Sequence, residues 1–389
     1  MESLMVDGMY FPCLSTKAFE FLAYEKSDDS VKDGCIPVVT LTRHGKAESF
    51  QQAAGFLLSA LDGRRAIVDF DPTPVEVTSA AEAERDRQRR SAARVQTGGK
   101  PIKGRSEKQL AADQRDRDGK EAFNTHLEIL GDPVKGPTSW IGIIAGFASL
   151  IPTVRLTSPE VVADQIALAA NLGCGCAVRV RLKEPAETAT FLRSLSLIES
   201  WPEGKSFLLV DAGYVRNKVP ANAEAVKDFL SRTKAAMGDP FNRIEVVLLS
   251  NSFPKDSLKD YPEVIAMAEV ELYRSIVRQW KISYGDYMSV AKRPKGSGSN
   301  GWYPHVDLVE PESWRIRLDM TKDDPQGFVR SAIALIGEAA WQGRERCWGT
   351  NVIEAVREGK LKVDGTTFTV PGPWLSVRAN QHLARMARR

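Results

Sequence analysis

Short, almost continuously apolar segments recur along this chain, each about as long as one β-strand. Such segments are typical of strands that are buried on both faces, as strands are in a parallel sheet. This feature restricts the fold more than any other, because parallel strands need long crossover connections, which are usually helices. The six clearest segments are residues 35–41, 66–70, 151–156, 176–182, 207–213 and 244–250.

Amphipathic helical patterns occupy the stretches between these segments. Residues 158–173 begin with Ser158, Pro159 and Glu160, which are an N-cap, a first-turn proline and a first-turn acid. Gly173 ends the pattern. Strands that alternate with helices of this length predict parallel βαβ units. The other helical patterns cover residues 47–61, 185–200, 221–238 and 261–280.

Two closures of such a sheet are compatible with the pattern, a doubly wound open sheet and a closed barrel. Further strand candidates are residues 281–286, 305–309 and 314–318. Counting the first and the third of these gives eight strands, as in a (β/α)8 TIM barrel. No glycine-rich dinucleotide fingerprint follows the first strand, which disfavours the open alternative. We therefore predict an α/β fold, with one TIM-barrel-like domain over residues 1–389.

One charged segment, residues 83–120, interrupts the alternation after the second predicted strand. It contains 12 basic and 6 acidic residues and almost no large apolar side chain. Such a segment cannot bury a core, so it is either a flexible insertion or a pair of solvated helices around Gly98 and Gly99. Residues 326–389 are predicted to form a C-terminal helical extension that ends in a basic helix. Residues 291–301 are predicted to form a loop rich in Gly, Ser, Lys and Arg.

The composition disfavours several classes of protein. With 53 basic and 50 acidic residues the net charge is +3, so any affinity for nucleic acid must come from a local basic patch such as residues 83–120. Five dispersed cysteines without a disulfide framework suit a reducing cytoplasm. No signal-peptide pattern opens the chain, and the longest apolar stretch, residues 140–151, is too short to span a bilayer. We expect a cytoplasmic protein with no membrane partner.

Polar residues at the ends of the apolar segments are candidate site residues, because ligands of parallel α/β folds bind at the carboxyl ends of the strands. Charged residues in apolar strands are costly unless they are paired or used. Arginines clamp phosphate or carboxylate groups with two hydrogen bonds, and aspartates serve as acid and base. The predicted catalytic residues are Asp69, Asp211 and Asp286, and the predicted ligand-binding residues include Arg155, Arg179, Arg181, Ser252 and Tyr284.

A buried network of arginine–aspartate pairs that fills the barrel interior would explain the same pattern equally well. The residues predict no metal site. Cys174 and Cys176 lack the second pair that a zinc site needs, and the four histidines are dispersed. Asp69 and Asp71 would share one strand face and could bind a metal ion if the strand continued, but Pro72 indicates that the chain already turns there. No cofactor is identified by these residues.

A series of short motifs extends over nearly the whole chain. The motifs are Tyr10–Leu14, Ile36–Val39, Ile151–Val154, Arg179–Arg181, Leu209–Gly213, Ser252–Pro254, Glu271 with Arg274, Tyr284–Tyr287, Cys347–Gly349 and Gln381–Leu383. In this order they resemble the bacterial and phage Beta protein family. The resemblance implies a barrel-like fold and a role in phage–host conflict, and it implies no established activity. Arg274, which belongs to these motifs, completes the predicted ligand-binding set.

Two functions are compatible with these features, and the residues do not decide whether the protein is an enzyme. The first is a barrel that binds a phosphorylated or nucleotide-like ligand, or nucleic acid, with Arg179, Arg181 and Asp211 at the centre of its site. The second is a non-enzymatic component of an antiviral defence or counter-defence system. In that case residues 83–120 and the basic C-terminal helix would contact a protein partner or nucleic acid.

Overall fold

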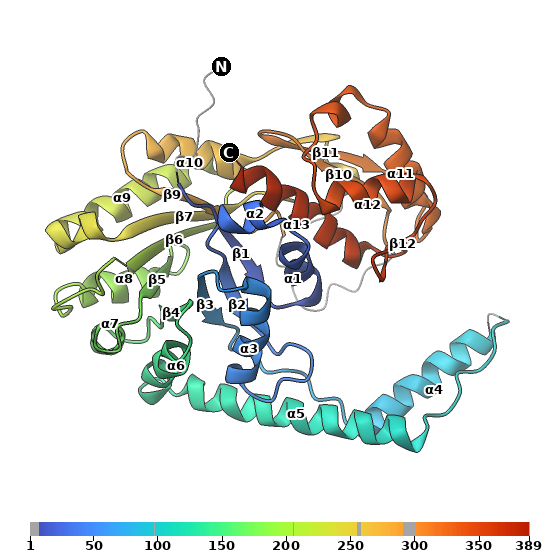
Figure 1. Cartoon of the computed structure of the whole chain (residues 1–389), viewed down its shortest axis with the longest axis horizontal. Helices are drawn as coiled ribbons and strands as arrows, with labels where there is room; N and C mark the ends of the chain where they lie inside the picture. Colours follow the sequence, from blue (N-terminus) through green and yellow to red (C-terminus); the bar gives the residue numbers. More distant parts are fainter. Residues whose placement is uncertain (1–7, 97, 205, 255–257, 291–300, 389) are drawn as a thin grey trace.

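The structure, a computed structural model, describes residues 8–388 except 97, 205, 255–257 and 291–300. Within this part of the chain, eight parallel strands close into a barrel (Figure 1), which confirms the predicted α/β barrel. Closure occurs at β9, which pairs with both β7 and β1. The barrel strands are β1 (Phe11–Ser15), β2 (Val38–Leu41), β3 (Ala66–Phe70), β4 (Leu150–Val154), β5 (Cys176–Arg181), β6 (Ser206–Tyr214), β7 (Glu245–Asn251) and β9 (Ser283–Asp286).

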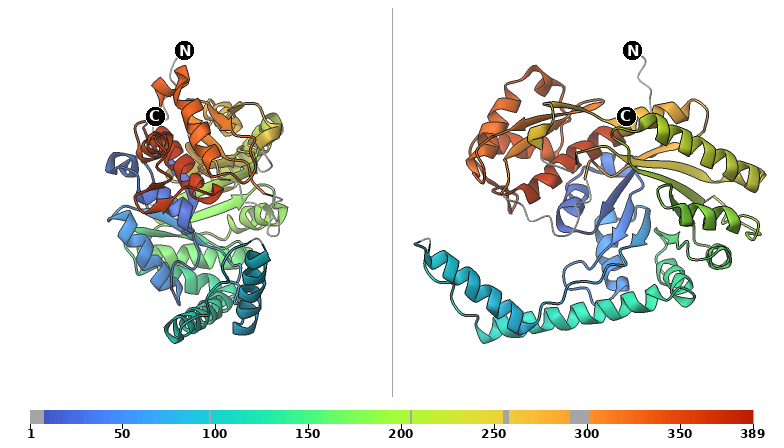
Figure 2. Two further views of the ribbon diagram at one scale, coloured as in Figure 1. Left: turned by 90° about the vertical axis from the view of Figure 1, so that its right-hand side faces the viewer. Right: turned by 180° about the vertical axis from the view of Figure 1, so that it is seen from behind.

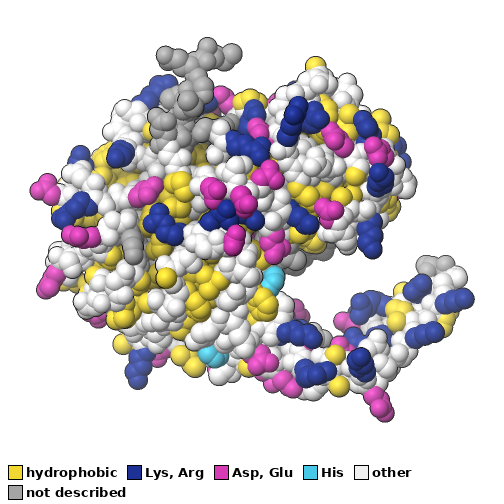
Figure 3. Space-filling model, viewed as in Figure 1, with side chains coloured by type: hydrophobic (Ala, Val, Ile, Leu, Met, Phe, Trp, Pro, Cys, Tyr) yellow, Lys and Arg dark blue, Asp and Glu magenta, His cyan; other side chains and the backbone are white. Residues whose placement is uncertain are grey.

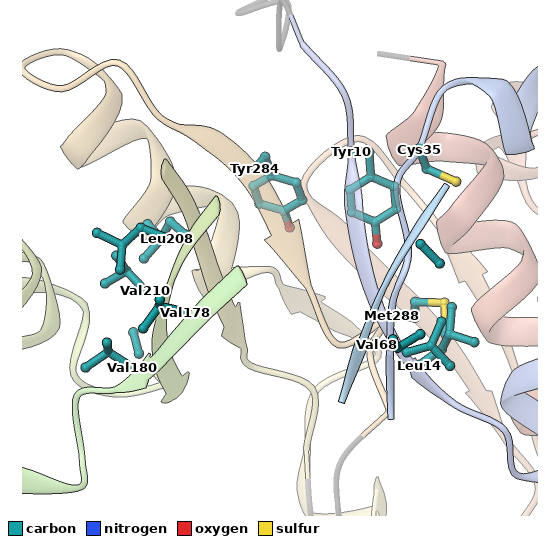
Figure 4. Close-up of a cluster of buried hydrophobic side chains, with 14 of the residues drawn as sticks. Tyr10, Leu14, Cys35, Val68, Val178, Val180, Leu208, Val210, Tyr284 and Met288 are labelled. Carbon is teal, nitrogen blue, oxygen red and sulfur yellow. The ribbon is translucent and has the colours of Figure 1, made fainter. Parts of the chain in front are cut away.

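Side chains on these strands alternate between the barrel interior and its outer face. Apolar side chains fill the interior over most of its depth, so the barrel is a packed core rather than a pore. The outward side chains Val178, Val180, Leu208 and Val210 point away from the interior in Figure 4 and belong to the core between the barrel and its helices. The interior cluster comprises Phe11, Cys13, Ile36, Val38, Ile67, Ile151, Ala177, Phe207, Leu209, Val247 and Leu249.

Gly285 on β9 permits the barrel to close without a gap. A Cβ atom at this position would lie 2.5 Å from Cδ2 of Leu249 and 2.7 Å from the carbonyl oxygen of Phe11. Both distances are shorter than carbon and oxygen atoms tolerate, and one partner is backbone that cannot move aside. The absence of a side chain at Gly285 therefore lets β9 pack against the interior side chains of its neighbours.

Helices surround the barrel and cover the outward side chains of its strands. Helix α7 shows why they begin where they do: the Ser158 side chain accepts a hydrogen bond from the amide of Val161, and Pro159 occupies the first turn. The helices around the barrel are α1 (Ala18–Glu25), α2 (Asp29–Asp33), α3 (Phe50–Leu61), α6 (Lys135–Ala145), α7 (Pro159–Asn171), α8 (Pro185–Ser194), α9 (Val219–Met237) and α10 (Ala268–Val277).

A C-terminal lobe with a core of its own lies beside the barrel, at the upper right of Figure 1. An antiparallel sheet in the order β10-β11-β8 leads into it, and helix α13 packs against both this lobe and α1 of the barrel. The sheet and the lobe contain β8 (Val264–Ala266), β10 (His305–Val309), β11 (Ser313–Leu318), α11 (Gln326–Ile336), the 3-10 helix η3 (Ala339–Gly343), α12 (Trp348–Arg357), β12 (Lys362–Val363), β13 (Thr366–Thr367) and α13 (Pro371–Ala387). Two other 3-10 helices, η1 (Asp239–Arg243) and η2 (Leu258–Asp260), precede and follow β7.

The charged segment after β3 forms two helices, α4 (Ala80–Gln96) and α5 (Glu107–Gly131), of which the second begins with a capping box formed by Ser106 and Gln109. This is the second of the two predicted alternatives. Helix α4 has no buried residue, whereas the C-terminal half of α5 buries Phe123, Leu127 and Leu130 against the barrel helices. Figures 1 and 2 show α4 and the start of α5 projecting from the molecule as an arm.

The eighth barrel strand is not the predicted one. Residues 314–318 form β11 in the antiparallel sheet, and Phe11–Ser15 form the missing barrel strand, so the charged insertion follows the third barrel strand. The physical reason lies in burial. Side chains of β11 alternate between buried and half-buried, as suits a sheet with one covered face, whereas those of β1 are nearly all buried.

The helix predicted over residues 261–280 begins later than expected, at Ala268, because Val264–Ala266 pair as β8 with β11 instead. The predicted loop at residues 291–301 lies almost wholly outside the described residues. None of the helices in the described ranges is long and apolar enough to cross a membrane.

Candidate functional site

Polar side chains replace apolar ones in the barrel interior at the carboxyl ends of the strands. The alternation that points Ile67, Ala177 and Leu209 inward continues to the next inward positions on the same strands. Those positions hold Asp69, Arg179 and Asp211, and Tyr287 follows β9 in the same way. The interior therefore ends in a charged layer, as the sequence predicts for three of these four residues.

The deepest part of this layer is an ion pair between Arg179 and Asp211. Nε and Nη2 of Arg179 lie 3.1 Å and 2.8 Å from Oδ2 of Asp211, and both side chains are buried. The hydroxyl of Tyr287 donates to the same carboxylate oxygen at 2.5 Å and accepts from Nη2 of Arg179 at 2.6 Å. The backbone amide of Gly213 donates to the other oxygen of Asp211 at 2.9 Å. Each partner is thus held by several hydrogen bonds.

Electrostatics reinforce this pair. Burial by itself would raise the pKa of Asp211, but the positive charge of Arg179 and the hydrogen bond from Tyr287 outweigh it and lower the pKa. Burial together with the Asp211 carboxylate raises the pKa of Tyr287 well above its ordinary value, even though the charge of Arg179 acts against it. The pair therefore stays charged and the tyrosine stays protonated. These three side chains close the barrel interior just below its mouth, which is the opening at the carboxyl ends of the strands.

A second, looser group lies nearer the solvent. The Asp69 carboxylate stands between two arginines, with Oδ1 3.9 Å from Nη1 of Arg155 and Oδ2 3.8 Å from Nη2 of Arg181. Both distances exceed a hydrogen bond. The Arg155 and Arg181 side chains are 29% and 45% exposed, compared with 8% for Arg179, so water and solutes reach them. Arg181 also forms an ion pair with Glu187, 2.7 Å away.

Arg155 is held in place without using its guanidinium donors. The Gln165 side chain on α7 binds its backbone on both sides, accepting from the Arg155 amide at 2.8 Å and donating to its carbonyl at 2.9 Å. The guanidinium lies over the ring of Phe70, 4.4 Å from the ring centre. In the described part of the chain, none of its N–H groups has a hydrogen-bond acceptor. Arg155 therefore presents an oriented guanidinium at the barrel mouth, and its N–H donors are available to a ligand.

Asp286 and Tyr284 belong to a different cluster, on the outer face of the barrel. The Asp286 carboxylate accepts from the hydroxyls of Tyr10 and Tyr284 at 2.5 Å and 2.7 Å, and Nε2 of His382 on α13 lies 2.6 Å from it. Figure 4 shows the two tyrosine hydroxyls pointing to the same side of the strands. Burial opposes ionisation of Asp286, but the charge and hydrogen bond of His382 outweigh it and lower the pKa. This cluster joins the barrel wall to the C-terminal helix.

Ser252 lies next to that outer cluster. Its hydroxyl donates to the buried carboxyl of Glu269 at the start of α10 and accepts from the amide of Ala268 at 3.0 Å. Burial and the nearby Asp286 carboxylate raise the pKa of Glu269 to about 7. The sequence analysis does not single out Glu269, and its only signal is an acid within the otherwise apolar stretch before Val270.

Arg274 is separate from both clusters. It lies on α10, is partly exposed, and forms an ion pair with Glu312 at the turn between β10 and β11. The structure therefore brings together Asp69, Arg155, Arg179, Arg181 and Asp211 of the predicted site residues. It places Asp286, Tyr284 and Ser252 behind the barrel wall and Arg274 on the surface.

Two other predicted features differ from expectation. The C-terminal helix, expected to offer a basic contact surface, is largely buried, and its His382 and Arg378 lie within the molecule. Tyr287, which completes the inner group, is absent from the predicted set, although strict alternation from Gly285 would have placed it inside the barrel. Among the described residues, no group of three or more His, Cys, Asp or Glu side chains is arranged to hold a metal ion.

Comparison with known proteins agrees with the sequence motifs. The model of a family described as Beta protein matches residues 10–388, which is nearly the whole chain. No curated protein matches.

Proposed function

The chain belongs to the Beta protein family, and we propose that its barrel binds a phosphorylated or nucleotide-like ligand at the carboxyl ends of the strands. Arg155 and Arg181 would hold the anionic group, and the Arg179–Asp211 pair would support it from below. The observation that carries the proposal is the guanidinium of Arg155, which is oriented by Gln165 and Phe70 but has no hydrogen-bond acceptor among the described residues.

The two arginine groups differ in what they can do. Arg179 and Asp211 neutralise each other, and removing either partner would leave a buried charge without its counterion, so this pair serves the fold. Arg155 and Arg181 both face Asp69 at distances beyond a hydrogen bond. Arg181 also donates from Nη1 to Glu187, so its Nη2 and all of the Arg155 guanidinium are the donors that a ligand would use. A phosphate bound on the solvent side of Asp69 would receive charge-assisted hydrogen bonds from both arginines, whereas Asp69 receives none from them. A guanidinium matches a phosphate because it offers two parallel N–H groups.

Binding rather than catalysis is what this geometry favours. Asp211 is saturated by Arg179, Tyr287 and Gly213, and Asp286 lies on the outer face of the barrel. Asp69 is the one member of the predicted catalytic set that reaches the mouth with an oxygen not engaged in a hydrogen bond among the described residues. The predicted part in phage–host conflict stays a prediction.

The test is calorimetric titration of the full chain with pyrophosphate, AMP and ATP. We expect at least one of them to bind, and the double variant Arg155→Gln, Arg181→Gln to bind it at least about thirtyfold more weakly, since each charge-assisted hydrogen bond contributes about 1.5–3 kcal/mol. Arg274→Gln is the control, because it removes a partly exposed arginine that lies on α10 outside this site and should leave binding unchanged. Equal affinity of the double variant and the wild type would refute the proposal.

A further inference from the structure

The arm, defined as α4 and residues 98–118, contains 11 basic and 7 acidic residues, a net charge of +4 against +3 for the whole chain. Residues 84–108 contain nine basic and three acidic residues, a net charge of +6, whereas residues 109–120 contain three of each. Figure 3 shows lysine and arginine side chains along the arm, across an open bay from the rest of the molecule. The charge is thus concentrated at the part of the arm that lies farthest from the barrel.

Much of this charge is not neutralised within the protein. Arg87 pairs with Glu84, and Arg105 pairs with Asp113. Other cations of the arm are exposed and form no ion pair within the described ranges of the chain, and five of them, on α4 and on the segment up to the start of α5, are used for the test below. They are Arg89, Arg90, Lys100, Lys103 and Lys108.

The arm also lacks the packing that would normally stabilise a helix. Helix α4 buries no residue. Three hydrogen bonds join it to the rest of the arm: Ser91 accepts from the amide of Ile102 at 2.9 Å, and Arg87 donates to the carbonyl oxygens of Ile102 and Lys103 at 3.1 Å and 3.3 Å. Most helical stability in proteins comes from tertiary packing, so α4 receives little stabilisation from the rest of the chain and has most of its surface available for a partner.

From these observations we infer that the arm binds duplex nucleic acid through its phosphate backbone, independently of the ligand at the barrel mouth. Aromatic side chains are the usual anchors of protein interfaces, and residues 71–122 contain no Phe, Tyr or Trp. The exposed large apolar side chains of the arm are Val95 and Leu110, of residue types that seldom anchor an interface. The absence of aromatic residues also disfavours single strands, whose bases stack on aromatic side chains. Exposed arginines and lysines on an extended arm match the remaining possibility, a regular array of phosphates read without base contacts.

The experiment measures binding of the full chain to fluorescently labelled duplex DNA and duplex RNA of about 25 base pairs across a salt series. If the five exposed cations each contact a phosphate, affinity should fall about 500-fold between about 50 and 200 mM KCl. Replacing the five with glutamine should weaken binding at least tenfold at the lowest salt. The same change should make the slope of log affinity against log salt about 4 units shallower.

A control variant separates the arm from net charge alone. Arg65, Arg193, Arg232, Arg243 and Lys281 are also exposed and lie on other parts of the surface, and their replacement by glutamine should leave duplex binding unchanged. The proposal is overturned if the wild type does not bind duplexes, if the control loses as much affinity as the arm variant, or if poly-glutamate binds more tightly than the duplex. It is also overturned if Arg155→Gln with Arg181→Gln weakens duplex binding as much as the arm variant does.

Discussion

Glu269 is a buried acid whose ionisation is opposed by its surroundings. Its pKa is raised to about 7 by burial and by the Asp286 carboxylate, against a value of 4.5 for a free side chain. The folded protein therefore holds this proton more tightly than the unfolded chain does. The resulting stabilisation is complete below about pH 4.5 and is lost as the pH rises through about 7, at a cost of up to about 3 kcal/mol.

Replacing Glu269 with glutamine should remove this pH dependence. The amide keeps a hydrogen-bonding partner for Ser252 and carries no proton that titrates. Urea denaturation should show the variant gaining stability relative to the wild type, by up to about 3 kcal/mol, as the pH is raised from 5 to 8. Glu271→Gln, on the exposed side of the same helix, is the control and should follow the wild type. Parallel stability curves for Glu269→Gln and the wild type would contradict the assignment.

The sequence predicted which strand ends carry polar residues better than it predicted which of these residues lie together at the barrel mouth. Arg179, Asp211 and Asp69 close apolar segments and point into the barrel, as expected. Asp286 ends β9 and Ser252 follows β7, but both occupy the opposite phase of the alternation and point outward. A polar residue at the end of an apolar segment marks where the strand stops, and it does not fix which face the side chain takes.

At the scale of elements, α4 should be among the least protected helices of the molecule. Amide protection follows the free energy of local opening, and a helix with no buried side chain opens without exposing any core. Hydrogen exchange followed by mass spectrometry should show α4 exchanging much faster than α9, a helix of similar length that buries Val226, Phe229 and Leu230. Equal protection of the two helices would show that α4 packs on something in the free protein.

Most elements followed from local pattern, and the exceptions share one cause. The pattern of Phe11–Ser15 does not predict a central strand, because Pro12 interrupts it. The pattern of Trp314–Leu318 does predict a strand, but one face of that strand is only half-buried. Which of the two enters the barrel depends on partners more than two hundred residues away, since β1 pairs with β9 as well as with β2. Such long-range pairing leaves no mark in the local pattern.

At the scale of the whole molecule, Asn380 on α13 forms hydrogen bonds that connect the C-terminal lobe to the barrel. Its side chain accepts from the amide of Gly349 at 2.8 Å and donates to the carbonyl oxygen of Ala23 and to Ser27 at 2.9 Å and 3.1 Å. One buried amide thus joins α12, α13 and α1.

Asn380→Ala should therefore destabilise the folded protein by about 2–4 kcal/mol, because it strands several buried polar groups without partners. Denaturation with urea measures this loss. Asn351→Ala, at an exposed position on α12, should change stability by less than about 0.5 kcal/mol. A loss as small at Asn380 as at Asn351 would mean that the lobe is held to the barrel by other contacts.

The cluster that joins Tyr10, Asp286 and His382 has a consequence for how the protein is made. Tyr10 directly precedes β1, Asp286 ends β9, and His382 lies on α13. During synthesis, β1 must wait for β9 before the barrel closes, and the closed wall must wait for α13, the last helix of the chain. The ribosome adds about 5–20 residues each second, so β1 spends many seconds without its later partner. We expect chaperones that shield exposed strand edges to engage this chain while it is still being translated.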